Sequence, residues 1–340
     1  MTNPAQTIAQ LGLRDEWLAQ VVEPIIDPAR EIIDPHHHFW NRGGHIYELD
    51  QLWADTGSGH NIRQTVFVEC RSAWDEAAPI MMQPVGETRY VAALAGQAKQ
   101  HPDRAQIGGI VGFADLRNPD LIKVLDAHEA AGSGRFRGIR HAGAWAGDMS
   151  FLMIAGRGFQ GQYADPDFRR GVALLGERGL TYDTWHYHPQ TPDFIELARG
   201  VPSTTMVFDH FGTPLGVGPF QDRRDAYFPV WKDQMARLAE CPNVIAKLGG
   251  LAMPDNGWGW HKRATPPTSD EFVAAQGDWY HHMINCFGPE RCMFESNFPV
   301  DRASISYPVL WNGLKKIASR YSDTAQEALF SGTARRIYRL

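Results

Sequence analysis

The stretch EIIDPHHHFW, residues 31–40, decides how the rest of the chain is interpreted. It opens as a short apolar, β-branched run, a pattern that predicts a buried strand. Because side chains alternate across a strand, Asp34, His36 and His38 are expected on one face. His37 then points the opposite way. Polar side chains at the end of a buried strand are costly unless they serve a site.

Seven more runs of this kind follow, each separated from the next by a segment with helical periodicity. The eight predicted strands are 31–39, 64–70, 107–116, 136–142, 180–188, 204–210, 243–249 and 292–298. The predicted helices are 84–100, 119–131, 166–178, 191–200, 222–240 and 270–286, with two closing helices at 303–320 and 323–338. Eight βα units predict an α/β fold of the (β/α)8 TIM-barrel type, with an open doubly wound sheet as the alternative.

The chain is expected to form one barrel domain, residues 31–340, preceded by an N-terminal extension, residues 1–30. The amphipathic piece RDEWLAQVV, residues 14–22, is expected to pack beneath or beside the barrel. Two long connections, 143–165 and 250–269, follow predicted strands. Loops longer than about 12 to 15 residues usually serve function, and barrel enzymes place their sites at the carboxyl ends of the strands.

The composition excludes several classes of protein. Of 340 residues, 43% are hydrophobic and 21% charged, and a net charge of −6 argues against nucleic-acid or anionic-membrane partners. Without a long apolar stretch or a leader pattern, we expect a cytoplasmic protein acting on a small molecule, with homo-oligomerisation left open. The four cysteines form no CxxC pair, so neither a disulfide framework nor a thiolate zinc site is indicated.

Histidines collect at the ends of three predicted strands. His186 and His188 follow the fifth strand, and His210 ends the sixth, directly after Asp209. Together with the His36-x-His38 pair they are expected to converge at the barrel mouth, where converging imidazoles have metal-ligand geometry. The alternative interpretation is a set of hydrogen-bonded structural histidines.

Other charged residues end neighbouring strands. Arg140 and His141 end the fourth strand and Lys247 the seventh, and preplaced cations stabilise developing oxyanions or hold a carboxylate. Glu69 ends the second strand, either as a site carboxylate or in an ion pair with Lys247 or Arg140. Asp183 is expected to orient a histidine, as is Asp34.

The long loops and the first strand also carry aromatic residues. Trp40, Trp145, Trp258 and Trp260 are expected near the mouth, where such residues line a pocket or an oligomer contact. Arg157, within GRGFQG, is a candidate for binding an anion, although its glycines lack the context of a nucleotide loop.

Six motifs in order together resemble a known family. They are DPHHHFW (34–40), GIRH (138–141), DTWHYHPQ (183–190), DHFGTP (209–214), AKLGGL (246–251) and FESNFPVD (294–301). The chain resembles the amidohydrolase superfamily, in its amidohydrolase-2 type and lactonase-like branch. The resemblance implies a metal-dependent barrel hydrolase. It implies one divalent metal, with zinc the expected ion, held by His36, His38, His210 and a fifth-strand histidine, His188 or His186.

The eighth strand departs from the family pattern. The family motif resembles GSDWP, whose aspartate binds metal and acts as the base, but this chain has Asn297 in that place. An amide cannot accept a proton at pH 7 and is a poorer ligand. By alternation Glu295 shares the face of Asn297 one layer deeper, so Glu295 or Glu69 could supply the carboxylate. Asp301, beside Arg302, is expected in a surface pair.

Three interpretations of the site follow. The histidines alone hold a metal, or the site works without metal, or hydrolysis has been lost. We expect a hydrolase that opens a lactone, or a related cyclic ester or amide, of a small carboxylated compound. One alternative is a lyase of the same superfamily, a nonoxidative decarboxylase or hydratase. The other is a barrel that binds a ligand without catalysis.

Overall fold

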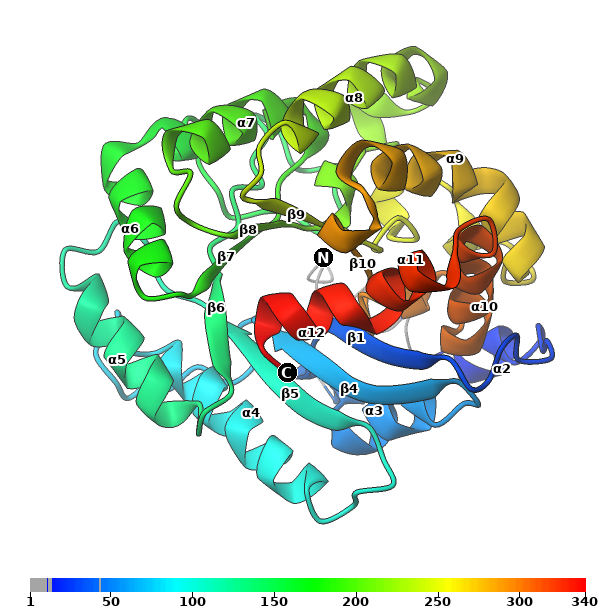
Figure 1. The fold of residues 1–340 in the computed structure, drawn as a ribbon, viewed down its shortest axis with the longest axis horizontal. Helices are drawn as coiled ribbons and strands as arrows, with labels where there is room; N and C mark the ends of the chain where they lie inside the picture. Colours follow the sequence, from blue (N-terminus) through cyan, green and yellow to red (C-terminus); the bar gives the residue numbers. More distant parts are fainter. Residues whose placement is uncertain (1–10, 12–13, 43) are drawn as a thin grey trace.

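The fold is a barrel of eight parallel strands, seen in a computed structural model that describes residues 11, 14–42 and 44–340. The strands follow one another around the barrel in chain order (Figure 1). They are β1 (Glu31–His37), β4 (Asn61–Val68), β5 (Gln106–Gly112), β6 (Phe136–Arg140), β7 (Thr181–Thr184), β8 (Met206–Phe208), β9 (Val244–Leu248) and β10 (Cys292–Phe294). The predicted (β/α)8 barrel is therefore confirmed.

The barrel closes through the sequence motifs themselves. His37 and Phe298 form a parallel bridge, and the His38 amide donates to the Phe298 carbonyl at 2.8 Å. The Asn297 amide donates to the His36 carbonyl at 3.1 Å. The first and last strands thus meet where the histidines and the FESNFP motif lie.

A ring of helices surrounds the strands, as Figure 1 shows. The helices are α2 (Asp15–Leu18), α3 (Leu49–Thr56), α4 (Val85–Ala98), α5 (Leu121–Ala131), α6 (Pro166–Glu177), α7 (Thr191–Gly200), α8 (Arg224–Ala239), α9 (Ser269–Phe287), α10 (Tyr307–Ala318), α11 (Asp323–Glu327) and α12 (Thr333–Tyr338). The predicted helix 323–338 is divided, because a π-helical turn (Ala328–Gly332) separates α11 from α12. The prediction missed α3 and the hairpin of β2 (Trp40–Arg42) and β3 (His45–Tyr47). Among the described residues, no helix is long and apolar enough to cross a membrane.

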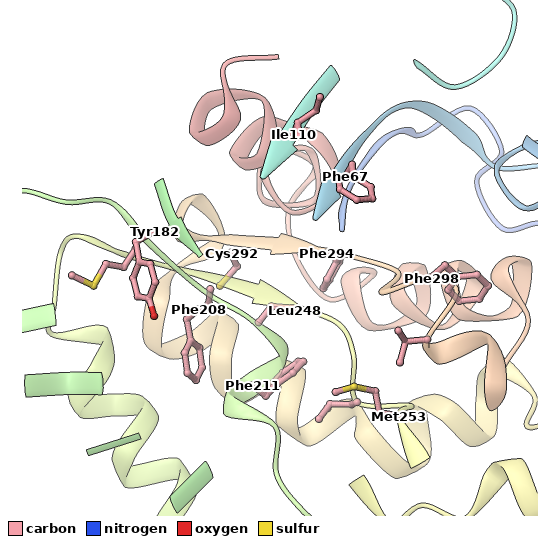
Figure 2. Close-up of a cluster of buried hydrophobic side chains, with 14 of the residues drawn as sticks. Phe67, Ile110, Tyr182, Phe208, Phe211, Leu248, Met253, Cys292, Phe294 and Phe298 are labelled. Carbon is pink, nitrogen blue, oxygen red and sulfur yellow. The ribbon is translucent and has the colours of Figure 1, made fainter. Parts of the chain in front are cut away.

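Two apolar layers hold the barrel together. Outward side chains such as Phe67, Phe208, Leu248 and Phe294 are fully buried within the cluster drawn in Figure 2. Inward side chains form a second layer, here called the barrel floor. The floor consists of Ile33, Val66, Val68, Val111, Val207, Ile245 and Met293, with Ala334 and Tyr338 of α12. Helix α12 crosses the barrel axis in Figure 1 and covers this end.

The N-terminal segment packs beside the barrel, against the loops that follow β9 and β10. The Arg14 guanidinium donates to the His261 and Ala303 carbonyls, and the Trp17 indole donates to the Arg263 carbonyl. Residues 1–10, 12 and 13 of the predicted extension lie outside the described residues.

The face expected for Asp34 is wrong. The β1–β4 register shifts between Asp34 and His37, which marks a bulge, and a bulge resets the alternation of side chains. Asp34 therefore accepts hydrogen bonds from the Tyr307 hydroxyl of α10 at 2.9 Å and the Ser296 amide at 2.9 Å. It ties β1 to the outer helices, whereas His36 faces the interior.

Candidate active site

A layer of polar side chains lies directly above the barrel floor. Three of them follow a floor residue by two positions, on its strand or just past its end: Lys247 after Ile245, Glu295 after Met293, and Asp209 after Val207. Alternation therefore places them inside the barrel, one step nearer the carboxyl ends. This polar layer comprises His36, Arg140, Asp183, Asp209, His210, Lys247 and Glu295, all buried.

Glu295 joins two histidines at the centre of the polar layer. Its Oε2 lies 2.7 Å from His36 Nδ1, and its Oε1 lies 2.6 Å from His210 Nδ1. His210 reaches this position in a left-handed conformation, with φ of 58°. Gly250 makes the room, because a Cβ there would stand 2.3 Å from His210 Nδ1. The hydrogen bond to Glu295 keeps the proton of His210 on Nδ1, so the lone pair of His210 is on Nε2.

His38 is fixed in the same tautomer by the backbone. Its Nδ1 lies 2.8 Å from the Val68 carbonyl, which can only accept, so Nδ1 carries the proton. Its Nε2 lies 3.3 Å from His36 Nε2, and Arg140 Nη1 stands 3.3 Å from the same His36 atom. Burial lowers the pKa of both histidines well below 6.5, with Arg140 lowering each further. Both rings are therefore neutral, with lone pairs facing one another.

The donor set fits a divalent metal. Tetrahedral Zn–N bonds of about 2.0–2.1 Å place two nitrogens about 3.3–3.4 Å apart, and the His36 and His38 Nε2 atoms are 3.3 Å apart. His36, Asp209 and His210 also offer ligand atoms within 4.8 Å of one another. Neither carboxylate oxygen of Asp209 has a hydrogen-bond partner among the described residues. Burial raises the pKa of Asp209 to about 6, and a nearby cation opposes this effect.

Two cations balance the carboxylates of this region. Lys247 Nζ lies 3.1 Å from Asp183 and 3.3 Å from Asp209, and Asp183 also accepts from the Tyr338 hydroxyl. Burial alone would lower the pKa of Lys247, but Asp209 and Asp183 raise it above its ordinary value. Arg140 binds Glu69 at 2.9 Å, the ion pair weighed for Glu69 in the sequence.

An open cavity of about 370 Å³ lies at the barrel mouth. Its wall comprises His38, Trp40, Arg42, Glu69, Cys70, Arg71, Phe113, Arg140, His141, Ala142, Met153, Ile154, Ala155, Gly156, Arg157, Trp185 and Val300. Four arginines face one glutamate, which is already paired with Arg140, so the cavity favours an anionic ligand. Burial lowers the pKa of His141 to about 4, so its ring is neutral. The Leu116 amide donates to His141 Nδ1 at 3.2 Å, which leaves Nε2–H for a ligand.

The histidines after β7 lie away from this cavity. His186 bonds to the Tyr163 and Thr191 hydroxyls, and His188 Nδ1 accepts from the Leu215 amide while its ring packs on Tyr227. Asp183 is the inward residue of β7, so the inward position two residues later is Trp185, which lines the cavity. The even-numbered phase assumed from the sequence was therefore one residue off.

Three of the predicted tryptophans also lie outside the cavity wall. Trp258 stacks under Arg224, with the guanidinium 3.6 Å from the ring centre, and Trp260 packs on Phe272 of α9. The Trp145 amide donates to Gln190. Trp40, which was expected near the mouth, does line the cavity. Arg157, the candidate for binding an anion, lines it as well.

Asn297 has a side-chain partner outside the polar layer. It has φ of 57°, and its Nδ2 donates to Asp301 Oδ1 at 2.9 Å. The expectation of a surface pair for Asp301 is wrong, because Asp301 is only 1% exposed and also accepts from the Ala252 amide. Arg302 instead pairs with Asp15 and Asp55.

Sequence reasoning missed Asp209 as a member of the buried donor cluster with His36 and His210. It also missed Trp185, Arg42 and Arg71 as cavity residues. The alternation of side chains along a strand could have predicted two of these residues. Asp209 follows the inward Val207 by two residues, and Trp185 follows the inward Asp183 by two. Arg42 and Arg71 lie after their strands, where alternation no longer predicts direction.

Together, the parallel barrel and its buried histidine centre define a barrel enzyme whose site opens at the carboxyl ends of the strands. The amidohydrolase family model matches residues 33–340, and the chain belongs to this family as an enzyme of the amidohydrolase type. It is 31% identical over 316 residues to an L-fucono-1,5-lactonase of Burkholderia multivorans, covering 91% of this chain and 96% of the relative. It is 32% identical over 330 residues to the uncharacterized protein y4mH of Sinorhizobium fredii, covering 91% and 98%.

The fold also matches solved structures. An amidohydrolase from Burkholderia multivorans with bound zinc superposes with a TM-score of 0.71 at 26% identity, over 91% of this chain and 99% of that one. The zinc in that neighbour and the donor cluster of His36, Asp209 and His210 both support a divalent metal in the family.

Proposed function

We propose that this enzyme hydrolyses a lactone, or a related cyclic ester or amide, of a small carboxylated compound. One observation carries the proposal: His38, neutral and fixed in its tautomer by the Val68 carbonyl, opens into the cavity beside Arg140. A relative that is a lactonase supports the choice of a cyclic ester. The arginine-rich cavity supports a substrate carboxylate.

Each residue of the site has a separate role in the proposed reaction. The Nε2 lone pair of His38 orients a water molecule and takes its proton as the oxygen adds to the carbonyl carbon. The ring C–O bond then breaks, and His38 returns the proton to the leaving ring oxygen. The Arg140 guanidinium faces the oxygen that becomes negative, since charge in a buried site is stabilised by a preplaced cation. His141 Nε2–H is a second donor to the substrate. Glu295 positions His36 and His210, and Lys247 positions Asp209. Glu295 and Lys247 are therefore positioning residues.

We propose that one divalent metal, with zinc the expected ion, is held by His36, His210 and Asp209, whose ligand atoms lie within 4.8 Å of one another. His38 is not a ligand, because its Nδ1 carries the proton and its Nε2 lone pair is the base. When bound there, such an ion polarises the carbonyl oxygen and lowers the pKa of a water ligand. His188 is not included, because its Nδ1 is occupied by the Leu215 amide. Asp209 then provides the carboxylate that Asn297 lacks.

The test is hydrolysis of a panel of 1,4- and 1,5-lactones with and without a carboxylate, in water labelled with heavy oxygen. One labelled oxygen is expected in the new carboxylate of the product. His38→Gln is expected to lower kcat by about 10²–10⁴-fold, the range for losing a general base. The exposed His101→Gln is the matched control and should leave kcat unchanged. A His38→Gln variant with full activity would exclude this role.

The metal is tested separately by elemental analysis before and after chelation. Zinc at about one equivalent, lost with chelator and restored with activity, is the expected result. Glu295→Gln should weaken zinc binding by about 10–100-fold, because partners of metal-bound histidines contribute that much to affinity. Turnover in protein free of metal would remove the ion from the proposal and leave His38 and Arg140 in place.

Nonoxidative decarboxylation is a second candidate, favoured by one observation. The eighth-strand position that carries the base in the family pattern holds Asn297, whose side chain donates to Asp301. A decarboxylase needs a proton delivered to carbon and incorporates no oxygen from water. Release of carbon dioxide from an aromatic acid, with no heavy oxygen in the product, would establish this reaction instead.

A further inference from the structure

Two of the four cavity arginines have no hydrogen-bond or ion-pair partner within the described residues. Arg140 binds Glu69, and Arg42 donates to the Cys70 carbonyl at 2.7 Å while lying over the Trp40 ring. Arg71 and Arg157 form no hydrogen bond or ion pair with any described residue. Both line the cavity that contains His38.

Arg71 is positioned by aromatic rings. Its guanidinium lies 4.8 Å from the centre of the Trp74 ring and 4.9 Å from the centre of the Phe113 ring. Its backbone is left-handed, with φ of 62°, a conformation that costs free energy in a residue with a side chain and that recurs at ligand sites. Stacking restrains the guanidinium without neutralising it, so its N–H donors remain for a ligand.

Arg157 is carried by a loop segment that two buried groups hold in place. The Asp255 carboxylate accepts from the Met153 amide at 2.8 Å and the Ile154 amide at 2.7 Å. The Tyr187 hydroxyl accepts from the Gly156 amide at 2.6 Å and donates to the Ile154 carbonyl. The loop 143–165 is thus tied to the loop 250–269, and Arg157 itself remains exposed.

The two guanidinium groups affect one another electrostatically. Burial lowers the pKa of Arg71, and the positive charge of Arg157 lowers it further. Neighbouring like charges repel, and an anion placed between them relieves that repulsion and bonds to both. A carboxylate suits the site, because a guanidinium presents two parallel N–H groups to two oxygens.

We propose that Arg71 and Arg157 form a carboxylate-binding subsite that selects ring compounds bearing a free carboxylate. The carboxylate bridges the two guanidinium groups, and the ring lies against Phe113 and Trp185 of the same cavity. The position of the reacting carbonyl at His38 rests on the proposed function, whereas the anion subsite does not. Hydrolysis of such a lactone yields a dicarboxylate.

Binding of unreactive probes tests the subsite directly. Calorimetry compares benzoate with benzamide, which matches its shape without the charge. The wild-type protein should bind benzoate more tightly, and Arg71→Gln and Arg157→Gln should each weaken benzoate about tenfold or more, as for a lost charge-assisted hydrogen bond. Benzamide binding should not change.

Arg117→Gln is the matched control. Arg117 contacts the same loop, 4.7 Å from the Phe159 ring centre, but it is already paired with Asp115 at 3.0 Å. Its loss should leave benzoate binding within twofold. The subsite is refuted if the wild-type protein binds both probes equally, or if Arg117→Gln weakens benzoate as much as Arg157→Gln does.

Kinetics separates this proposal from the proposed function. With a carboxylated lactone, both cavity variants should raise KM at nearly constant kcat, and the methyl ester of that lactone should show no such rise. If the wild-type enzyme hydrolyses no lactone yet discriminates benzoate from benzamide through these arginines, the subsite stands and lactone hydrolysis fails.

Discussion

Two layers of the barrel interior differ in chemistry although the same strands build them. Ile245 in the barrel floor and Lys247 in the polar layer are two residues apart, face the same interior and are 4% and 0% exposed. The floor is stabilised by apolar contact, worth about 25 cal/mol per Å² of buried surface. In the polar layer, burying each charge costs desolvation free energy, which only an interaction with a partner can offset.

This difference teaches where stability and function reside. Pairing buried charges seldom returns more than their desolvation costs, so the floor and the outer apolar layer must supply the stability. The chain nevertheless places Lys247, Arg140, Asp209 and Glu295 in the layer nearest the strand ends, where the cavity opens. Because these charges are buried away from water, each side chain depends on a charged partner for its stabilisation. This dependence fixes the positions of the four side chains relative to one another.

The largest loss of stability is expected from Lys247→Met. Removing the cation leaves Asp183 and Asp209 buried without compensation, so the free energy of unfolding should fall by about 3–5 kcal/mol at pH 8. The loss should be smaller at pH 5, because protonation of Asp209, whose pKa is about 6, removes one charge. Urea unfolding at both pH values measures this difference.

A surface pair provides the control for Lys247. Lys316 binds Asp270 at the surface, where the Asp270 side chain is 83% exposed. Lys316→Met should therefore cost only about 0–1 kcal/mol. Equal losses for the two lysine variants would show that burial does not decide the strength of these pairs.

Buried histidines outside the polar layer sharpen the comparison through pH. His128 accepts from the Thr88 hydroxyl and donates to the Phe113 carbonyl, and burial lowers its pKa to about 4. The unfolded chain therefore binds a proton between pH 6.5 and 4 that the folded chain rejects, so folding stability from this residue is lost as pH falls. At pH 4 the loss reaches about 3 kcal/mol.

The free energy of unfolding of His128→Gln, measured as a function of pH, gives the contribution of His128 to this pH dependence. The variant loses hydrogen bonds at pH 7, but it has no proton to reject, so its deficit relative to the wild-type protein should shrink between pH 6.5 and 4. A deficit that stays constant with pH would mean that His128 is protonated in the folded state.

The sequence predicted the fold well because its signals are local. Apolar runs such as 64–70 and 243–249 alternate with amphipathic segments, and strands buried on both faces indicate a parallel sheet covered by helices. The count of eight such units favoured a closed barrel over an open doubly wound sheet. The hairpin β2–β3 and helix α3 were missed because their stretches are short and mixed in polarity. The division of the last predicted helix depends on packing against the floor, which periodicity does not report.

The candidate site was predicted only as far as strand alternation extends. His36, His38, Arg140, Lys247 and Glu295 converge as expected. Beyond the strand ends the backbone leaves the extended conformation, so side-chain direction depends on tertiary contacts. His210 enters the site through a positive φ, and a phase error of one residue exchanged His186 for Trp185. The bulge at Asp34 is likewise invisible in the pattern.

A smaller effect is expected from Asn297→Asp. The family pattern predicts tighter metal binding, but Asn297 faces Asp301 at 2.9 Å, so a second carboxylate should repel the first. We expect a loss of about 1–3 kcal/mol at pH 8, the cost of an unsatisfied buried polar group, with no gain in zinc affinity. The double variant Asn297→Asp, Asp301→Asn exchanges the partners and should restore stability. Tighter zinc binding in the single variant would instead place residue 297 among the ligands.

The smallest effect is expected in the floor. Ile245→Val removes one methylene group and should cost about 0.5–1.5 kcal/mol, independent of pH, because no charge loses a partner. Its kcat and KM should stay within twofold of the wild-type values, since the neighbours close much of so small a gap and Lys247 keeps both aspartates. A larger kinetic change would mean that the floor sets the position of the polar layer, and the two layers would then act as one unit rather than as a support and a site.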